Sequence, residues 1–175
     1  MSARRVEAPV ADLFGGAGAN AAVFSECARY RYQLWRVWDG SLPYVLFVGL
    51  NPSTADELND DPTIRRCIAF AKSWGYGGLC MGNLFAFRAT LPAVMKAHPE
   101  PVGVENDAQL AAAAATAGLV VAAWGLDGEH LGRAKQVKQL LPTMHVLKLT
   151  KDGHPNHPLY LRKAQVPIPW HGVKP

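Results

Sequence analysis

The order of apolar and polar residues predicts strands that alternate with helices along most of the chain. Residues 45–50 are continuously apolar, as expected of a strand buried on both faces of a sheet. Further buried strands are predicted at 79–87, at 119–123 and at 144–149. Strands that are separated by helices typically pair in parallel, with the helices packed on both faces of the sheet.

The segments between these strands carry helix signals. Asp61 precedes a proline and a threonine, so we expect it to cap a helix that ends at the glycines of 75–78. Two more helices are predicted at 106–117, where an alanine run permits close packing, and at 128–140. The predicted fold class is α/β: a three-layer α/β/α sandwich with a central, mostly parallel four-stranded sheet.

Two features are predicted ahead of this sheet. Residues 29–38 alternate large and charged side chains, and an Asp-Gly turn signal at 39–40 separates them from the first buried strand. We therefore expect an antiparallel hairpin there. The glycine- and alanine-rich residues 1–22 are expected to form a flexible N-terminal arm, and residues 23–175 a single domain.

Composition excludes several classes of protein. Of the 175 residues, 49% are hydrophobic and 18% are charged, which excludes disorder and allows a sizeable core. No apolar run approaches the roughly 18–20 residues that span a bilayer, and the N-terminus lacks a signal-peptide core. The three cysteines are too few and too scattered for a disulfide framework or a zinc cage. We expect a cytoplasmic monomer with reduced thiols.

Charge leaves the choice of partner open. The net charge is +4, with acid gathered at 56–61 and base concentrated in the C-terminal third. This distribution is compatible with a phosphate backbone as partner and equally with an ordinary solvated surface. Arg65 and Arg66, in the first turn of the predicted helix, are either solvated or phosphate-facing. Trp124 suits the core better than it suits a base-stacking platform.

Candidate chemistry gathers at the ends of the predicted strands. In open parallel sheets, ligands bind beyond the carboxyl ends of the strands. The polar and histidine side chains follow this rule, so we expect them to converge on one site. The candidates are Gly49, Leu50, Asn51, Pro52 and Ser53 after the first strand, Asn83 in the second, Trp124 and Gly125 after the third, and His154 and His157 after the fourth.

Each polar candidate has a structural role and a functional role to choose between. Asn51 either caps a turn or orients a water molecule, and Asn83 is either a structural hydrogen-bonding group or a reader of a base edge. His154 and His157 are better placed to donate to a developing oxyanion than to bind a metal, because no acidic or cysteine ligand is tied to them. Asp60 and Asp61 are either helix caps, or one of them activates water.

The motifs at these strand ends resemble those of the uracil-DNA glycosylase superfamily over about residues 44–162. That superfamily has a Gly-x-Asp/Asn-Pro motif after its first core strand, a base-reading Asn and a His-Pro-Ser-Pro-Leu-type loop. A longer pattern resembles the family catalogued as domain of unknown function 1643, over GLNPSTAD, DDPTIRRC, WGYGG, NLFAFRAT and HPLYL. The glycosylase resemblance implies DNA repair by hydrolysis of the N-glycosidic bond of a modified or mismatched base.

The same resemblance implies roles for individual residues. Asn51 would orient the water, and Asn83 would bind the Watson–Crick edge of a flipped base. Either His154 or His157 would stabilise charge on the departing base. The segment that meets DNA would contain Leu159, Tyr160, Arg162 and Lys163, with the two basic residues able to contact phosphates. No metal or other cofactor is implied.

The first motif departs from the most active branch of that superfamily. Asn51-Pro52-Ser53 stands where that branch has a carboxylate followed by Pro-Tyr-His. An amide can position water but cannot take its proton, and Ser53 leaves room for a bulkier base. Three hypotheses therefore stay open: a DNA glycosylase-like hydrolase, a non-catalytic module that binds a nucleobase, nucleotide or DNA, and an enzyme that acts on a free nucleoside or nucleotide.

Overall fold

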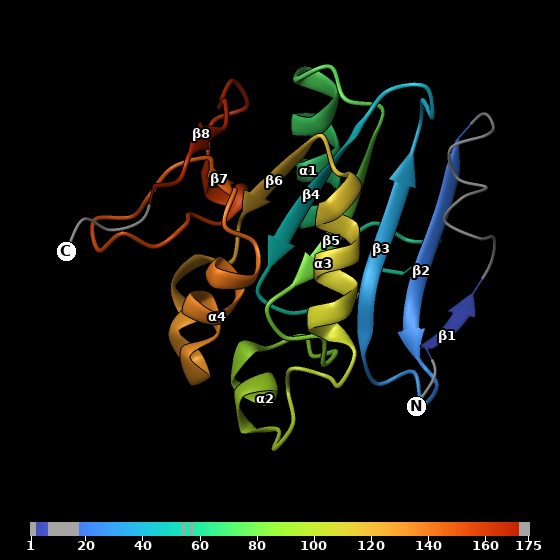
Figure 1. The fold of residues 1–175 in the computed structure, drawn as a ribbon, viewed down its shortest axis with the longest axis vertical. Helices are drawn as coiled ribbons and strands as arrows, with labels where there is room; N and C mark the ends of the chain where they lie inside the picture. The colour runs from blue at the N-terminus through green and yellow to red at the C-terminus, as the bar shows by residue number, and fades with distance from the viewer. Residues whose placement is uncertain (1–2, 7–17, 54, 57, 172–175) are drawn as a thin grey trace.

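The computed structural model describes residues 3–6, 18–53, 55–56 and 58–171, with only the backbone of 3–6 (Figure 1). These residues form one eight-stranded sheet in the order β1-β2-β3-β5-β4-β6-β7-β8. The strands are β1 (Ala3–Val6), β2 (Ala19–Ser25), β3 (Arg31–Val37), β4 (Tyr44–Gly49), β5 (Gly78–Asn83), β6 (Leu119–Ala122), β7 (His145–Val146) and β8 (Ile168–Pro169). The predicted α/β class is confirmed.

The sheet is larger and more mixed than predicted. Strand β4 pairs in parallel with β5 and β6, and β6 pairs in parallel with β7. The pairs β1–β2, β2–β3, β3–β5 and β7–β8 are antiparallel. Residues 19–22, which we assigned to a flexible arm, lie in β2 and pair with β3, whereas 7–17 lie outside the described residues. The small side chains of β2 hid its strand pattern.

The predicted hairpin of residues 29–38 with the first buried strand is wrong. Strand β5 lies between β3 and β4. The amides of Trp38 and Asp39 both donate to the Gly77 carbonyl at 2.9 Å, which brings the start of β5 against the turn. A Cβ atom on Gly77 would lie 1.9 Å from the Asp39 carbonyl oxygen, so this approach requires glycine.

The helices are α1 (Pro62–Ser73), α2 (Pro92–Ala97), α3 (Asn106–Thr116), α4 (Arg133–Leu140) and the 3₁₀ segments η2 (Gly125–Gly132) and η3 (Pro158–Tyr160). The three predicted helices are present as α1, α3 and α4 with shifted ends, whereas α2 was not predicted. Asp61 caps α1 as predicted, because its Oδ1 accepts from the Ile64 amide at 2.9 Å. The helix predicted at 128–140 begins only at Arg133, since Leu131 and Gly132 have left-handed backbones with φ of 54° and 66°.

Helices lie against both faces of the sheet, and Figure 1 shows α3 in front of it. Alternate residues of β4 point to opposite faces, so Phe47 packs in one core with Phe70 of α1. Leu46 packs in a second core with Leu110 of α3 and Val137 of α4. Within the described ranges, no helix is both long and apolar enough to span a membrane.

Candidate functional site

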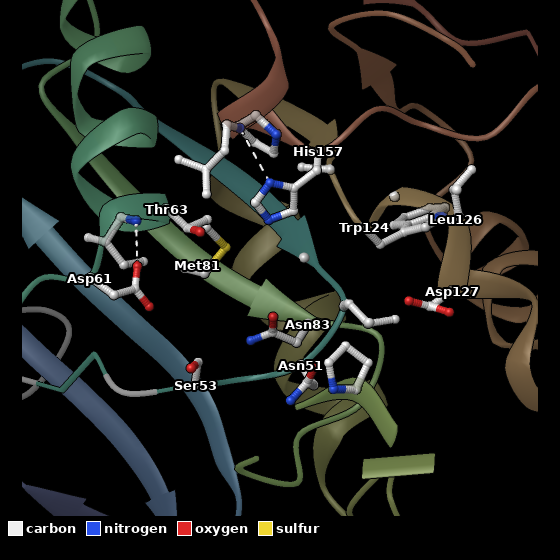
Figure 2. A pocket seen from close by; sticks show the side chains of 18 of the residues that line it. Asn51, Ser53, Asp61, Thr63, Met81, Asn83, Trp124, Leu126, Asp127 and His157 are labelled. Atoms are coloured by element: carbon white, nitrogen blue, oxygen red, sulfur yellow. Dashed lines mark hydrogen bonds between the residues drawn. The ribbon is translucent and has the colours of Figure 1, made fainter. Parts of the chain in front are cut away.

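A cavity of about 440 Å³ lies at the carboxyl ends of β4, β5 and β6 (Figure 2). The register of the sheet explains its position, because Gly49 at the end of β4 pairs with Asn83 at the end of β5. The predicted site residues that line it are Gly49, Leu50, Asn51, Ser53, Asp61, Asn83, Trp124, Gly125, His157, Leu159 and Tyr160. Segments far apart in the chain thus meet at this edge of the sheet.

Four other predicted residues do not line this cavity. Pro52 is buried, and its carbonyl accepts from the Ala89 amide at 3.0 Å. The Nδ1 atom of His154 lies 3.6 Å from a carboxylate oxygen of Glu129. Arg162 and Lys163 are exposed. Of the two candidate histidines, His157 is therefore the one at the cavity.

Asn83 presents an unpaired amide to the cavity. Its side chain is 3% exposed, and its Nδ2 has no hydrogen-bond partner among the described residues. A Cβ atom on Gly49 would lie 2.8 Å from its Oδ1, so the missing side chain of Gly49 leaves room for this amide. A buried donor without a partner costs about 1–3 kcal/mol. A ligand with a hydrogen-bond acceptor would recover that cost.

Asn51 uses its donors on the main chain and leaves its acceptor free. Its Nδ2 donates to the carbonyls of Pro52 at 3.1 Å and Ala89 at 2.8 Å. Within the described part of the chain, its Oδ1 accepts no hydrogen bond. The same side chain therefore fixes the turn after β4 and keeps an acceptor for a water molecule or a ligand donor.

His157 is held in one tautomer. Its Nδ1 accepts from the Leu159 amide at 3.3 Å, and Figure 2 shows this hydrogen bond with the other ring nitrogen on the cavity side. Burial lowers the pKa of His157 below 6.5, and the nearby charge of Asp61 opposes this shift only in part. The ring is therefore neutral at pH 7, with its proton on Nε2, and can donate into the cavity.

Two carboxylates line the cavity and differ in their partners. Asp127 forms an ion pair with Lys96, with Oδ1 and Nζ 2.5 Å apart. Asp61 uses Oδ1 to cap α1, and in the part of the chain that the structure describes it forms no ion pair. The second carboxylate oxygen of Asp61 is therefore available for chemistry.

Arg31, at the start of β3, also lines the cavity and was missed from the sequence. Its side chain is 2% exposed, one terminal nitrogen donates to the Ala55 carbonyl, and its Nε has no partner among the described residues. Burial lowers the pKa of Arg31 to about 10, so it stays positively charged at neutral pH. Nothing in the sequence singled out Arg31, because it is one of several polar residues in a strand that also contains Gln33 and Arg36.

The remaining aromatic and basic candidates stabilise the fold. Trp124 is 2% exposed and packs edge-on against Trp170, which confirms its place in the core, although it also lines the cavity. Arg65 donates to the Asp60 carbonyl at 2.6 Å. Arg66 donates to the Leu161 carbonyl and lies over the ring of Phe70, so it ties the segment after His157 to α1.

The described ranges contain no group of three or more His, Cys, Asp or Glu side chains that could hold a metal ion. The three cysteines are free thiols, with Cys27 exposed and with Cys67 and Cys80 buried.

The fold and the cavity together define a mixed α/β protein with polar side chains gathered at the carboxyl ends of parallel strands. The chain belongs to the family described as "Protein of unknown function (DUF1643)", whose family model matches residues 31–159. The match therefore includes every residue that lines the cavity except Tyr160. No curated protein and no solved structure matches the chain significantly.

Proposed function

We propose that the cavity binds a nucleobase and that the protein hydrolyses the N-glycosidic bond of a modified or mismatched base in DNA. The observation that carries this proposal is the buried, unpaired amide of Asn83 at the cavity. An amide offers a donor and an acceptor side by side, which matches the edge of a base. The cavity volume of about 440 Å³ falls within the range of small-ligand sites.

The reaction adds water to the anomeric carbon of the sugar while the bond from that carbon to the base nitrogen breaks. Asn51 accepts a hydrogen bond from the water through its free Oδ1 and so orients it. The second carboxylate oxygen of Asp61 accepts the proton that the water loses, a step that an amide cannot perform. The Nε2–H of His157 stabilises the negative charge on the departing base. The products are an abasic sugar and a free base, which takes up a proton.

A second candidate function is recognition of the same base without hydrolysis. It is favoured by Asn51, an amide where a proton-accepting carboxylate would serve a hydrolase better, with both N–H groups tied to main-chain carbonyls. The two functions share a ligand and differ only in turnover. They are separated by asking whether bound DNA acquires an abasic site.

The test uses oligonucleotides that carry uracil, hydroxymethyluracil or thymine in a mismatch, with abasic sites measured by alkaline cleavage. His157→Ala should slow excision by about 100-fold or more, since it removes the donor to the leaving base. His154→Ala is the matched control and should stay within about twofold of wild type, because His154 lies outside the cavity.

Each other outcome is informative. Equal losses in the two histidine variants would contradict the assigned role of His157. Binding of these oligonucleotides without any abasic site would support the non-catalytic function. Neither binding nor excision with all three would contradict both functions.

A further inference from the structure

Arg31 carries a buried charge that the described protein does not neutralise. No carboxylate oxygen of a described residue lies within ion-pair distance of its guanidinium, whereas Arg36 and Arg133 each pair with an aspartate at 2.8 Å. The one hydrogen bond of its side chain within the described ranges goes to the Ala55 carbonyl, and its Nε has none. Leaving a buried cation unpaired is unfavourable, so the site is completed when an anion enters.

The charges around Arg31 act in opposite directions. Asp61 and Asp56 favour its charged form, whereas Arg88 and Arg36 disfavour it. Asp61 is the acidic group with the largest effect, but its Oδ1 is used by the Ile64 amide and it does not contact the guanidinium as an ion pair. The positive charge of Arg31 therefore remains available to a ligand.

The first turn of α1 borders the same cavity as Arg31. Thr63 lines the cavity, and its main-chain N–H makes no hydrogen bond to the described residues, because it lies in the first turn of the helix. The N-terminus of a helix favours negative charge, and a threonine hydroxyl adds another donor. Arg31 and Thr63 thus supply a charge and donors to one space, which is the chemistry that binds a phosphate group.

We propose that Arg31, with the first turn of α1, binds a phosphate group of the ligand. The cavity then binds a nucleotide, either free or within a nucleic-acid strand, more tightly than a bare base or a nucleoside. The base half of this ligand rests on the proposed function, whereas the phosphate half rests on Arg31 and the first turn of α1. A phosphate monoester and a phosphodiester share this chemistry, so the experiment must separate them.

Arg36 provides a matched control on the same strand. It is 4% exposed, and like Arg31 it donates to main-chain carbonyls of the loop between β4 and α1, at Asp56 and Asn59. Unlike Arg31 it is paired, with Asp60 at 2.8 Å, and it does not line the cavity. If Arg31 acted only by holding this loop, replacing Arg36 would have the same effect on binding.

The experiment measures by calorimetry the affinities of 2′-deoxyuridine, its 5′-monophosphate, a uracil-containing trinucleotide and inorganic phosphate. Wild type should bind the monophosphate or the trinucleotide at least about tenfold more tightly than the nucleoside. Arg31→Gln should reduce this preference to within about twofold of unity and abolish phosphate binding, while Arg31→Lys retains part of it. Arg36→Gln should keep the full preference.

The outcomes show whether the phosphate belongs to a free nucleotide or to a strand. They also test the phosphate site separately from the proposed hydrolysis. A preference for the monophosphate indicates a free nucleotide, and a preference for the trinucleotide alone indicates a strand. An unchanged preference in Arg31→Gln, or an equal loss in Arg36→Gln, would overturn the phosphate site even if DNA excision is observed. Arg31-dependent binding of inorganic phosphate without excision would contradict the hydrolase and support the site.

Discussion

Two regions of the molecule bury the same kinds of polar side chain and use them differently. Where α3 and α4 pack against β5, Asn106 donates to the carbonyls of Asn83 and Leu84 at 2.9 and 3.1 Å, and Arg133 donates to the Leu84 carbonyl at 3.0 Å. At the cavity, the side-chain Nδ2 of Asn83 and the Nε of Arg31 have no partners among the described residues. Burial therefore does not distinguish the two regions. In the first, the donors of Asn106 and Arg133 are paired and, among the described residues, only the acceptor Oδ1 of Asn106 is not, whereas at the cavity donors of Asn83 and Arg31 are unpaired.

This difference follows from where each pair lies. In the first region, Asn106 at the start of α3 and Arg133 at the start of α4 reach main-chain carbonyls at the end of β5. The second region lies beyond the last residues of β4 and β5, where the chain turns away from the sheet and leaves a cavity. Asn106 and Arg133 use their donors within the fold, whereas the unpaired donors of Asn83 and Arg31 are those that we propose for a ligand.

The largest contrast in stability is expected between the two arginines. Arg133→Met should lower the free energy of unfolding by about 2–3 kcal/mol, because it removes a hydrogen bond to a buried carbonyl and the ion pair with Asp107. Arg31→Met should lower it by less than about 1 kcal/mol, since the lost bond to Ala55 is offset by removal of an unpaired buried charge. Urea unfolding followed by circular dichroism measures both. Equal losses of free energy of unfolding in the two variants would show that Arg31 stabilises the fold as much as Arg133 does.

Replacing the two buried asparagines should lower the free energy of unfolding by different amounts, and this difference should be smaller than that between the arginines. Asn106→Ala should cost about 2 kcal/mol, because two buried carbonyls lose a donor. Asn83→Ala should change the free energy of unfolding by less than about 1 kcal/mol, because its Nδ2 has no bond to lose. The same urea titrations give both values. A loss in Asn83→Ala that matches Asn106→Ala would place Asn83 with the structural group.

The smallest expected effect is a dependence of the free energy of unfolding on pH, which comes from His157. Burial keeps the pKa of His157 below 6.5, so the unfolded chain binds its proton more readily than the folded protein does. The contribution of His157 to the free energy of unfolding is therefore complete above pH 6.5. It falls as the pH decreases toward the pKa that His157 has in the folded protein. His157→Asn should flatten this part of the curve, and His154→Asn serves as the control outside the cavity. Superimposable curves for wild type and His157→Asn would refute a buried neutral imidazole.

Local patterns predicted the parts of the fold that local chemistry decides. Asp61 before a proline predicted the start of α1, and the apolar run before Gly49 predicted the buried strand β4. Because parallel strands end at one edge, the sequence also predicted that Asn51, Asn83 and His157 meet, as they do at the cavity.

Features that depend on contacts between distant segments could not be predicted. The insertion of β5 between β3 and β4 depends on the approach of Gly77 to the turn at Asp39, 38 residues earlier in the chain. Nothing local separates His154 from His157, because the distinction lies in what each contacts across the fold. Arg31 was missed because the pattern of a strand indicates which side chains alternate between its faces. It does not show whether a buried charged side chain forms an ion pair with another part of the fold.

The most direct test of a nucleobase site follows the side-chain amide of Asn83 by ¹⁵N–¹H NMR while free uracil is added. We expect its two N–H resonances to shift in a saturable way, while those of Asn106, already bonded to main-chain carbonyls, stay in place. Asn83→Ala should weaken the binding of uracil by about tenfold or more. Unmoved Asn83 resonances at millimolar uracil, or unchanged affinity in Asn83→Ala, would contradict the proposal that this amide binds a base.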